Sequence, residues 1–233
     1  MKELFFEKNF NLSDKQIEKF ESYYNLLIEY NNKFNITAIT DKKEVYIKHF
    51  IDSILSEKEF NNYSLLDVGS GGGFPAIPLK IVNENLTVSM LEATEKKCEF
   101  LRAVVNNLNL TNVNVINGRA EEFALKKEYR EGYDICSARA VARLNILAEY
   151  CMPFVKVGGT FLAFKGEIGL EELSEAENAI KTLGGQIDKI EEFDLFGNKR
   201  YVIHVKKIKR TDLKYPRKNG QIRKKPLWRK TWI

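Results

Sequence analysis

The 233-residue sequence is poor in metal-binding and disulfide-forming side chains, with only three cysteines and two histidines. The cysteines are widely spaced and contain no Cys-x-x-Cys pair, which argues against a disulfide framework. Two histidines are too few for a multi-histidine site, so we expect no bound metal. No apolar run approaches the roughly 20 residues that cross a bilayer. Acidic residues also interrupt the apolar N-terminal segment, as they would not in a signal peptide. These absences predict a protein of the reducing cytoplasm with no membrane contact.

Basic residues are concentrated at the C-terminal end. Twelve of the 37 lysines and arginines lie between Lys206 and Lys230, where Asp212 is the only acid, so this segment carries +11. The other 25 basic and 31 acidic residues give the rest of the chain −6, within a total of +5. A mildly acidic body with a basic end predicts a polyanionic partner. A solvated tail without a ligand is the alternative.

The N-terminal third has the apolar spacing of helices. Ser13 and Gln16 form a capping-box pattern, and Asp41 and Glu44 form a second one. Each pattern precedes apolar residues at helical spacing. Neither predicted helix contains a catalytic grouping, so we interpret residues 1–60 as a helical extension.

Strand and helix patterns alternate from residue 64 onward. The expected strands are 64–68, 87–91, 113–117, 134–138, 160–164, 186–191 and 201–206, and the expected helices are 76–82, 95–108, 144–155 and 170–183. This alternation predicts an α/β fold with a doubly wound, mostly parallel sheet of seven strands. Residues 193–198 replace a helix between the last two strands, which should therefore form an antiparallel hairpin. We expect this sheet domain to cover 61–207, with a basic tail over 208–233.

A glycine-rich segment follows the first expected strand. Residues 67–75 read Asp-Val-Gly-Ser-Gly-Gly-Gly-Phe-Pro. Glycines let the backbone turn sharply and approach a ligand without a Cβ clash. Ligands of doubly wound sheets bind at the carboxyl ends of the strands, so Gly69 and Gly71 are predicted ligand contacts. A tight turn without a ligand is the alternative.

Two further segments fit an adenosine lying across the strand ends. Glu92 ends the second expected strand, where a carboxylate can accept hydrogen bonds from both ribose hydroxyls. Ala120 and Glu121 follow the third strand and would bracket an adenine. A diphosphate beside Asp67 would be repelled, whereas the zwitterionic end of S-adenosylmethionine is compatible with that carboxylate. Together with the terminal hairpin, this favours a methyltransferase over a dinucleotide enzyme.

Six segments form a set more specific than any single motif. They are 30–37 (YNNKFNIT), 48–53 (KHFIDS), the glycine loop 67–78, 137–140 (SARA), 164–166 (FKG) and 216–220 (PRKNG). With this set nearly the whole chain resembles the glucose-inhibited division protein B family, the guanine-N7 methyltransferases of small-subunit (16S) ribosomal RNA. The resemblance implies a Rossmann-like class I methyltransferase fold and S-adenosylmethionine as cofactor.

The resemblance also implies which residues bind the methyl donor. By position these are Gly69, Phe74, Ala120, Glu121 and Arg139. Glu92 stands where the family usually has aspartate, a conservative change for ribose binding. The tail departs from the family pattern Arg-Lys-x-Gly-x-Pro, because Gln221 and Ile222 interrupt it.

Methyl transfer to guanine N7 depends on alignment more than on proton transfer. N7 carries a free lone pair, so we expect no general base. Enzymes that methylate amino groups typically carry an Asn/Asp-Pro-Pro-Tyr motif, which residues 137–140 do not match. Pyrimidine carbon-5 methylation needs a nucleophilic cysteine. Cys136 lies close by, but in an apolar strand a buried core residue is the favoured interpretation. We expect His49 and His204 to be structural.

Arg139 ends the fourth expected strand and is the candidate for positioning the target base. A guanidinium there would donate to guanine O6 or hold the methionine carboxylate. A structural ion pair with Asp134 or Glu121 is the alternative. Lys165, at the end of the fifth strand, is a candidate RNA contact, with a merely exposed lysine as the alternative.

The tail combines basic and aromatic residues, as phosphate contacts and base stacking require. Its candidate RNA contacts are Arg217, Lys218, Arg223, Lys224 and Lys225, and its aromatic residues include Trp228 and Trp232. One hypothesis is that it orders only on RNA. The sequence thus predicts a monomeric enzyme acting on small-subunit ribosomal RNA or the small ribosomal subunit. A methyltransferase of another RNA, a small molecule or a protein is one alternative, and an RNA-binding module with a vestigial pocket is another.

Overall fold

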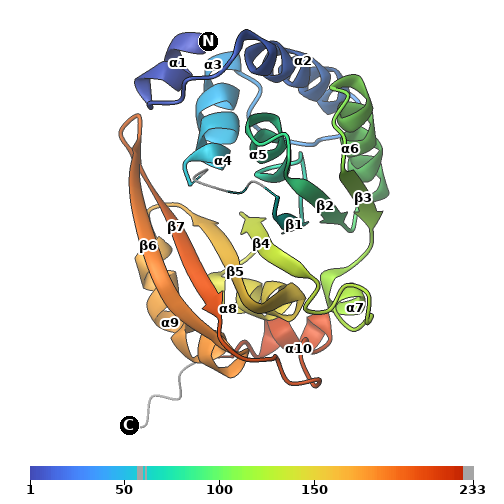
Figure 1. The fold of residues 1–233 in the computed structure, drawn as a ribbon, viewed down its shortest axis with the longest axis vertical. Helices are drawn as coiled ribbons and strands as arrows, with labels where there is room; N and C mark the ends of the chain where they lie inside the picture. The colour runs from blue at the N-terminus through green and yellow to red at the C-terminus, as the bar shows by residue number, and fades with distance from the viewer. Residues whose placement is uncertain (57–59, 61, 228–233) are drawn as a thin grey trace.

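A seven-stranded sheet with helices on both faces forms the centre of the molecule (Figure 1). The computed structural model describes residues 1–56, 60 and 62–227. The strands are β1 Ser64–Val68, β2 Thr87–Glu92, β3 Val113–Asn117, β4 Tyr133–Arg139, β5 Val155–Lys165, β6 Gly185–Leu195 and β7 Asn198–Lys207. Their order across the sheet is β3-β2-β1-β4-β5-β7-β6.

The direction of the strands confirms the predicted doubly wound sheet. β3, β2, β1, β4 and β5 pair in parallel, and β7 is antiparallel to both β5 and β6. The connecting helices are α5 Ala76–Val82, α6 Glu95–Asn107, α7 Ala120–Phe123, α8 Leu144–Cys151 and α9 Gly169–Thr182. All five carboxyl ends of the parallel strands therefore meet at one edge of the sheet.

Two predicted boundaries are wrong for local reasons. The bridge expected over 193–198 is only a two-residue turn, in which Phe196 and Gly197 both have positive φ, at 51° and 82°. Such a turn matches the twist of paired strands, so β6 and β7 extend to it. The helix expected over 144–155 ends at Cys151 because Pro153 cannot continue it. A 3-10 turn, Met152–Phe154, then leads directly into β5.

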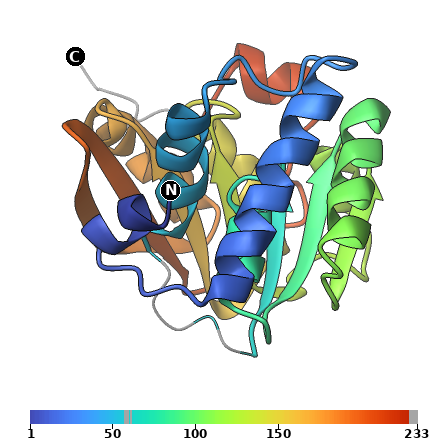
Figure 2. The same ribbon diagram turned by 90° about the horizontal axis from the view of Figure 1, so that it is seen from above.

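The helical extension covers one face of the sheet (Figure 2). It consists of α1 Lys2–Glu7, α2 Asp14–Asn31, α3 Lys42–Val45, the π-helix η1 Tyr46–Ile51, and α4 Asp52–Ile54. Both N-caps are confirmed: Ser13 forms a complete capping box with Gln16, and the Asp41 carboxylate accepts the Glu44 N–H at 2.9 Å. The π turn inside the second helical segment was not predicted, because apolar spacing does not distinguish it from an α turn.

Side chains alternate between the two faces of the sheet and form two cores. Leu65, Val88 and Ile135 join the core under the extension, which is rich in aromatic rings. Leu66 and Cys136 join the core under α8 and α9 on the opposite face. Strands buried on both faces explain why their sequences read as nearly continuous apolar runs.

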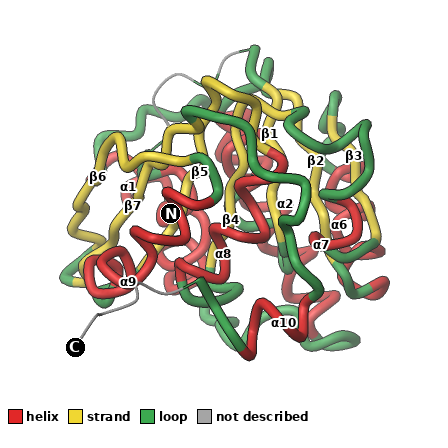
Figure 3. The backbone as a smooth tube through the Cα atoms, turned by 90° about the horizontal axis from the view of Figure 1, so that it is seen from below, coloured by secondary structure: helices red, strands yellow, loops and turns green. Residues whose placement is uncertain are grey.

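The C-terminal segment packs against the sheet domain as far as the structure describes it. The Arg130 guanidinium donates to the carbonyl oxygens of Thr211 (2.9 Å), Asp212 (3.1 Å) and Tyr215 (2.9 Å). A short helix, α10 Asn219–Lys224, follows, and its Ile222 is completely buried. Figure 3 shows α10 beside α7 and α8. The segment therefore has a defined place on the sheet domain over residues 208–227, and the predicted contacts of Trp228 and Trp232 lie outside the described residues.

One buried ion pair should hold this segment in place. Arg217 binds the fully buried Glu149 carboxylate through Nε (2.8 Å), Nη2 (2.6 Å) and its backbone N–H (2.9 Å). Arg217→Ala leaves that carboxylate buried without its cation, so we expect a loss of about 3 kcal/mol in the free energy of unfolding. Urea denaturation measures it, with exposed Lys218→Ala as the neighbouring control. Equal stability of the two variants would contradict this role of the ion pair.

Candidate active site

The glycine loop turns at the carboxyl end of β1 in a conformation that needs glycine. Gly69, Gly71 and Gly73 have φ of 72°, 56° and 88°, a region that residues with a Cβ rarely adopt. A Cβ on Gly69 would lie 2.8 Å from Val141 Cγ2, and one on Gly73 would lie 2.5 Å from Ile77 Cδ1. The loop is therefore both left-handed and closely packed.

The Glu92 carboxylate fixes this loop to the end of β2. One of its oxygens accepts the Gly71 N–H and the other accepts the Thr94 N–H, each at 2.9 Å. The side chain is buried, and the Glu92 carbonyl also accepts the Gly118 N–H at 3.0 Å. Glu92 thus links the first, second and third strand ends, the three segments that the sequence predicted to share one ligand.

Beside the loop lies a cavity of about 130 Å³, called here the glycine-loop cavity. Its wall contains three of the predicted donor-binding residues: Gly69, Ala120 and Glu121. It also contains Asn219 and Arg223 from α10, and Tyr150 from α8. The cavity therefore joins the predicted adenosine segments to the C-terminal helix.

A second cavity, of about 590 Å³, adjoins it and is called here the Arg139 cavity. Val141 lines both cavities. The cationic side chains of the Arg139 cavity are Lys48, Arg139, Arg143, Lys165 and Arg200, against the two acids Asp52 and Glu172. All five cations are ion-paired, but Lys48 and Arg143 pair with Glu44 and Glu175 outside the cavity wall, which leaves the wall itself with an excess of positive charge.

Arg139 is held by the helical extension. Its Nη1 donates to Asp52 Oδ2 at 2.8 Å and to the carbonyl oxygen of Lys48 at 3.2 Å. Asp52 Oδ1 accepts a further bond from Arg200 Nε at 3.1 Å. Arg139 therefore does form a structural ion pair, the predicted alternative, but its partner is Asp52. Of the two expected partners, Asp134 pairs with Lys156 at 3.0 Å and Glu121 lines the glycine-loop cavity.

Phe74 lies under this arginine and outside both cavities. Its ring stacks on His49 with centroids 4.5 Å apart, and the Arg139 guanidinium lies 5.0 Å above it. Burial and the Arg139 charge lower the pKa of His49 to about 3. His49 is therefore neutral at pH 7, and its Nε2 hydrogen-bonds Thr37 Oγ1 at 2.8 Å. The stacked rings of Phe74 and His49 therefore pack against the Arg139 guanidinium.

Several predicted site residues lie elsewhere than expected. Gly71, Glu92 and Phe74 do not line the glycine-loop cavity: Gly71 and Glu92 are hydrogen-bonded to each other, and Phe74 packs against His49 and Arg139. Lys165 is buried against Glu172 at 2.8 Å and donates to the Ala142 carbonyl at 2.8 Å. It is neither an exposed lysine nor a free phosphate ligand, since its ammonium already has two partners.

In the tail, one predicted RNA contact has a structural position and a second lines a cavity. Arg217 is occupied by Glu149, and Arg223 lines the glycine-loop cavity. Lys218, Lys224 and Lys225 are exposed, and Arg223 is exposed as well as lining the cavity. The signal for a pocket residue at Asn219 was present in the segment 216–220, but nothing in the sequence placed that segment beside β1 and β3.

A buried acid lies beneath the glycine loop. Asp67 is fully buried, and its Oδ1 accepts the Ser137 hydroxyl at 2.7 Å. Its Oδ2 has no hydrogen-bond partner among the described residues. Burial raises the pKa of Asp67 to about 7, against the opposing effect of hydrogen bonds from Ser137 and Ser70. An acid in this state responds strongly to a cation bound above it.

Cys136 is a core residue rather than a nucleophile. It is completely buried in β4, and burial raises the pKa of its thiol well above the ordinary value. Only the thiolate is nucleophilic. The core interpretation of this residue is therefore confirmed.

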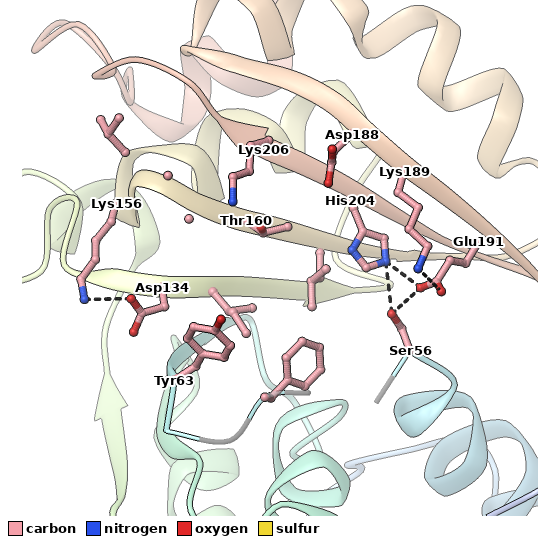
Figure 4. Close-up of a pocket in the computed structure, with 16 residues that line it drawn as sticks. Ser56, Tyr63, Asp134, Lys156, Thr160, Asp188, Lys189, Glu191, His204 and Lys206 are labelled. Atoms are coloured by element: carbon pink, nitrogen blue, oxygen red, sulfur yellow. Dashed lines mark hydrogen bonds and ion pairs between the residues drawn. The ribbon is translucent and has the colours of Figure 1, made fainter. Parts of the chain in front are cut away.

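A third cavity, of about 570 Å³, lies near the amino ends of β4 and β5 (Figure 4). His204 there contacts the Glu191 carboxylate at 2.7 Å, and Ser56 donates to the same oxygen at 2.6 Å. Ser56 Oγ also lies 3.2 Å from His204 Nε2, but this is the nitrogen that contacts Glu191, whereas a catalytic triad places the serine and the acid on different ring nitrogens. This cavity is at the wrong edge of the sheet for the glycine loop.

Two kinds of feature are absent from the described part of the chain. No helix in it is long and apolar enough to cross a membrane. No group of three or more histidine, cysteine, aspartate or glutamate side chains there has the geometry of a metal site.

Known proteins resemble the chain over most of its length. The family model described as rRNA small subunit methyltransferase G matches residues 16–201. A protein of Acetivibrio thermocellus named Ribosomal RNA small subunit methyltransferase G is 49% identical over 224 residues, covering 93% of this chain and 91% of the relative. A protein of the same name from Lactobacillus acidophilus is 46% identical over 226 residues, covering 94% of each.

Solved structures resemble the fold at low sequence identity. A SAM-dependent methyltransferase from Aquifex aeolicus is 17% identical with a TM-score of 0.56, covering 73% of this chain and 96% of that one. TYW2 of M. jannaschii, solved in complex with AdoMet, is 17% identical with a TM-score of 0.52, covering 67% and 77%. The sheet is thus of the Rossmann-like methyltransferase type.

The raised pKa of Asp67 predicts a pH-dependent stability of the ligand-free protein. The folded-state pKa of about 7 lies above the ordinary 3.8, so the protonated acid stabilises the fold at low pH. Between pH 4 and pH 7 the unfolded chain has released this proton while the folded protein retains it, so the free energy of unfolding falls by up to about 1.4 kcal/mol per pH unit and levels off above pH 7. Asp67→Asn cannot ionise and should lack this loss.

Thermal unfolding of both proteins at pH 5, 6 and 7 measures the effect, with pH 8 as the plateau above the folded-state pKa. The melting temperature of the wild type should fall relative to Asp67→Asn across this range. Parallel melting curves would mean that Asp67 is not protonated in the folded protein. Asp134→Asn, at an acid whose pKa is lowered, is the control.

Proposed function

Because this chain belongs to the ribosomal RNA small subunit methyltransferase G family, we propose that it transfers a methyl group from S-adenosylmethionine to small-subunit ribosomal RNA. The acceptor atom is N7 of a guanine. The substrate is the RNA itself or the small ribosomal subunit, which an enzyme of this kind meets in the cytoplasm, acting as a monomer.

The observation that carries this proposal is the pair of adjoining cavities at the carboxyl edge of the sheet. The glycine-loop cavity contains the predicted adenosine segments, and the Arg139 cavity contains five cations. Val141 is common to both. A donor in the first cavity and a base in the second would therefore meet at residues 139–143, the alignment that methyl transfer requires.

The residues of the loop fit the methyl donor. A Cβ on Gly71 would meet only one atom within 4 Å, the Gly69 carbonyl oxygen at 3.9 Å, so the loop has an open side. The unpartnered Oδ2 of Asp67 lies beneath it and favours a cation above. The bound donor supplies an electrophilic methyl group on a sulfonium, and its methionine end carries an ammonium group. The Glu92 carboxylate would accept hydrogen bonds from the ribose hydroxyls. It would use the oxygen lone pairs that the N–H groups of Gly71 and Thr94 leave free.

The Arg139 cavity supplies orientation and charge. Arg139 is fixed by Asp52 and the η1 carbonyls, so its remaining N–H groups point in a set direction. Donation to guanine O6 would hold N7 in line with the methyl group. His49, neutral with a pKa of about 3, is too weak a base to act at pH 7. N7 needs none, since its lone pair is already free.

RNA phosphates would bind the exposed cations around this edge. We retain Lys218, Lys224 and Lys225 as proposed RNA contacts because they are exposed. Arg217 and Lys165 act through the fold instead, since each has a buried carboxylate partner. Phosphate contacts fix the position of the RNA, and the base pocket supplies the choice of nucleotide.

The decisive experiment uses small ribosomal subunits from a strain that lacks this gene. Labelled methyl from S-adenosylmethionine should enter one site, and reduction with aniline scission should cut the RNA there. Label without scission would reject N7 but keep the methyltransferase. If no label entered subunits or free RNA while the donor still bound, small-molecule or protein acceptors would replace RNA.

The Arg139→Lys variant should weaken the reaction with RNA while leaving the binding of the methyl donor nearly unchanged. The lysine keeps the charge but loses the planar fork, so we expect kcat/KM for RNA to fall about 100-fold. The Kd of S-adenosylmethionine should change less than about threefold, because Arg139 lines the Arg139 cavity only.

Arg102→Lys is the matched control, since Arg102 forms an exposed ion pair with Glu95 on α6, at 2.7 Å. Steady-state methylation and calorimetric titration give the two constants. A large rise in the donor Kd with unchanged RNA kinetics would assign Arg139 to the methionine carboxylate instead.

A further inference from the structure

The C-terminal helix α10 forms part of the wall of the glycine-loop cavity. Asn219 and Arg223 line it together with Gly69, Ala120 and Glu121. Asn219 and Arg223 lie at least 98 positions after the other three residues, and none of the predicted donor-binding residues lies in the tail. The cavity is thus closed by a segment that the charge pattern assigned to RNA alone.

Three sets of contacts hold α10 against this cavity. Ile222 is completely buried in the core under α8. Arg217, just before the helix, is bound to the buried Glu149 of α8. The Tyr150 hydroxyl, also from α8, donates to Asn219 Oδ1 at 2.6 Å. A helix of six residues is not stable alone, so its position is set by α8.

The hydrogen bond from Tyr150 decides what Asn219 offers to a ligand. With Oδ1 accepting from the tyrosine, the amide nitrogen Nδ2 is left with two N–H groups. Glu121, on the same cavity wall, offers a carboxylate acceptor. Adenine presents an exocyclic amine and ring-nitrogen acceptors along one edge, so one donor and one acceptor can read it together.

We propose that α10 belongs to the methyl-donor site, with Asn219 donating to the adenine ring and the exposed lysines of the same segment binding RNA. This rests on the proposed function. Lys218, Lys224 and Lys225 are exposed while Asn219 lines the cavity. RNA that stabilises α10 in this position therefore stabilises the donor site, and each ligand raises the affinity for the other by the same factor.

The test of the donor contact is calorimetric titration of the full chain with S-adenosylhomocysteine, without RNA. Asn219→Ala should raise the Kd about tenfold, the effect of one lost hydrogen bond. Asn219→Asp keeps the bond from Tyr150 but removes the N–H donors, and should bind at least as weakly. Tyr150→Phe should have a smaller effect in the same direction, because it only frees the amide to rotate.

Gln221→Ala is the matched control. Gln221 is an amide on the same helix, exposed and outside the cavity wall. Its removal should leave the Kd unchanged, and circular dichroism should show the same melting temperature for both alanine variants. Equal Kd values for folded Asn219→Ala, Asn219→Asp and wild type would overturn the proposal.

A second experiment tests the coupling to RNA. It measures the Kd of S-adenosylhomocysteine with and without small ribosomal subunits from a strain that lacks this gene. We expect at least about fivefold tighter binding with subunits. The gain should disappear in the Lys224→Ala/Lys225→Ala double variant. An unchanged Kd in the wild type would reject the coupling. Failure of the wild type to bind S-adenosylhomocysteine at all would instead reject the proposed function.

Discussion

The structure depends on the Asp52 carboxylate, which binds two arginines from different strands. Asp52 belongs to the helical extension, Arg139 ends β4 and Arg200 lies on β7. The Asp52 and Arg139 side chains are each only 11% exposed, so the charges are shielded from water and neither can lose its partner cheaply. This contact fixes the extension against the carboxyl edge of the sheet and gives Arg139 one orientation. Without it the Arg139 cavity would have neither its shape nor its directed donors.

A second constraint is that side chains from outside the glycine loop hold its backbone in place. Glu92 binds the Gly71 amide, Tyr23 of the extension donates to the Gly72 carbonyl, and Phe74 packs among the aromatic rings of the same core. A loop of glycines is otherwise costly to order, since glycine loses the most conformational freedom on folding. Its rigidity is therefore supplied by β2 and by α2. The extension, in which the sequence shows no catalytic grouping, supports both halves of the candidate site.

The C-terminal segment contributes residues to the wall of the glycine-loop cavity and also carries the exposed basic residues. Its anchors are a buried ion pair, a buried isoleucine and a set of carbonyls bound by Arg130. Residues that looked equivalent as a run of cations have different positions: Arg217 is structural, Arg223 lines a cavity and Lys224 is exposed. Charge density in a sequence thus identifies only the class of ligand. It does not say which of the cations already have partners within the protein.

The sequence by itself determined the sheet, its strand directions, the capped helices and the glycine loop. These follow from local periods and from turn chemistry, which act over a few residues. It also placed Gly69, Ala120 and Glu121 at one edge, since parallel strands end together. Only the tertiary structure decided that Asp52 rather than Asp134 pairs with Arg139, that Lys165 is buried, and that Asn219 faces the glycine loop. Each of these contacts joins residues far apart in the chain, and their choice depends on packing geometry that no local pattern encodes.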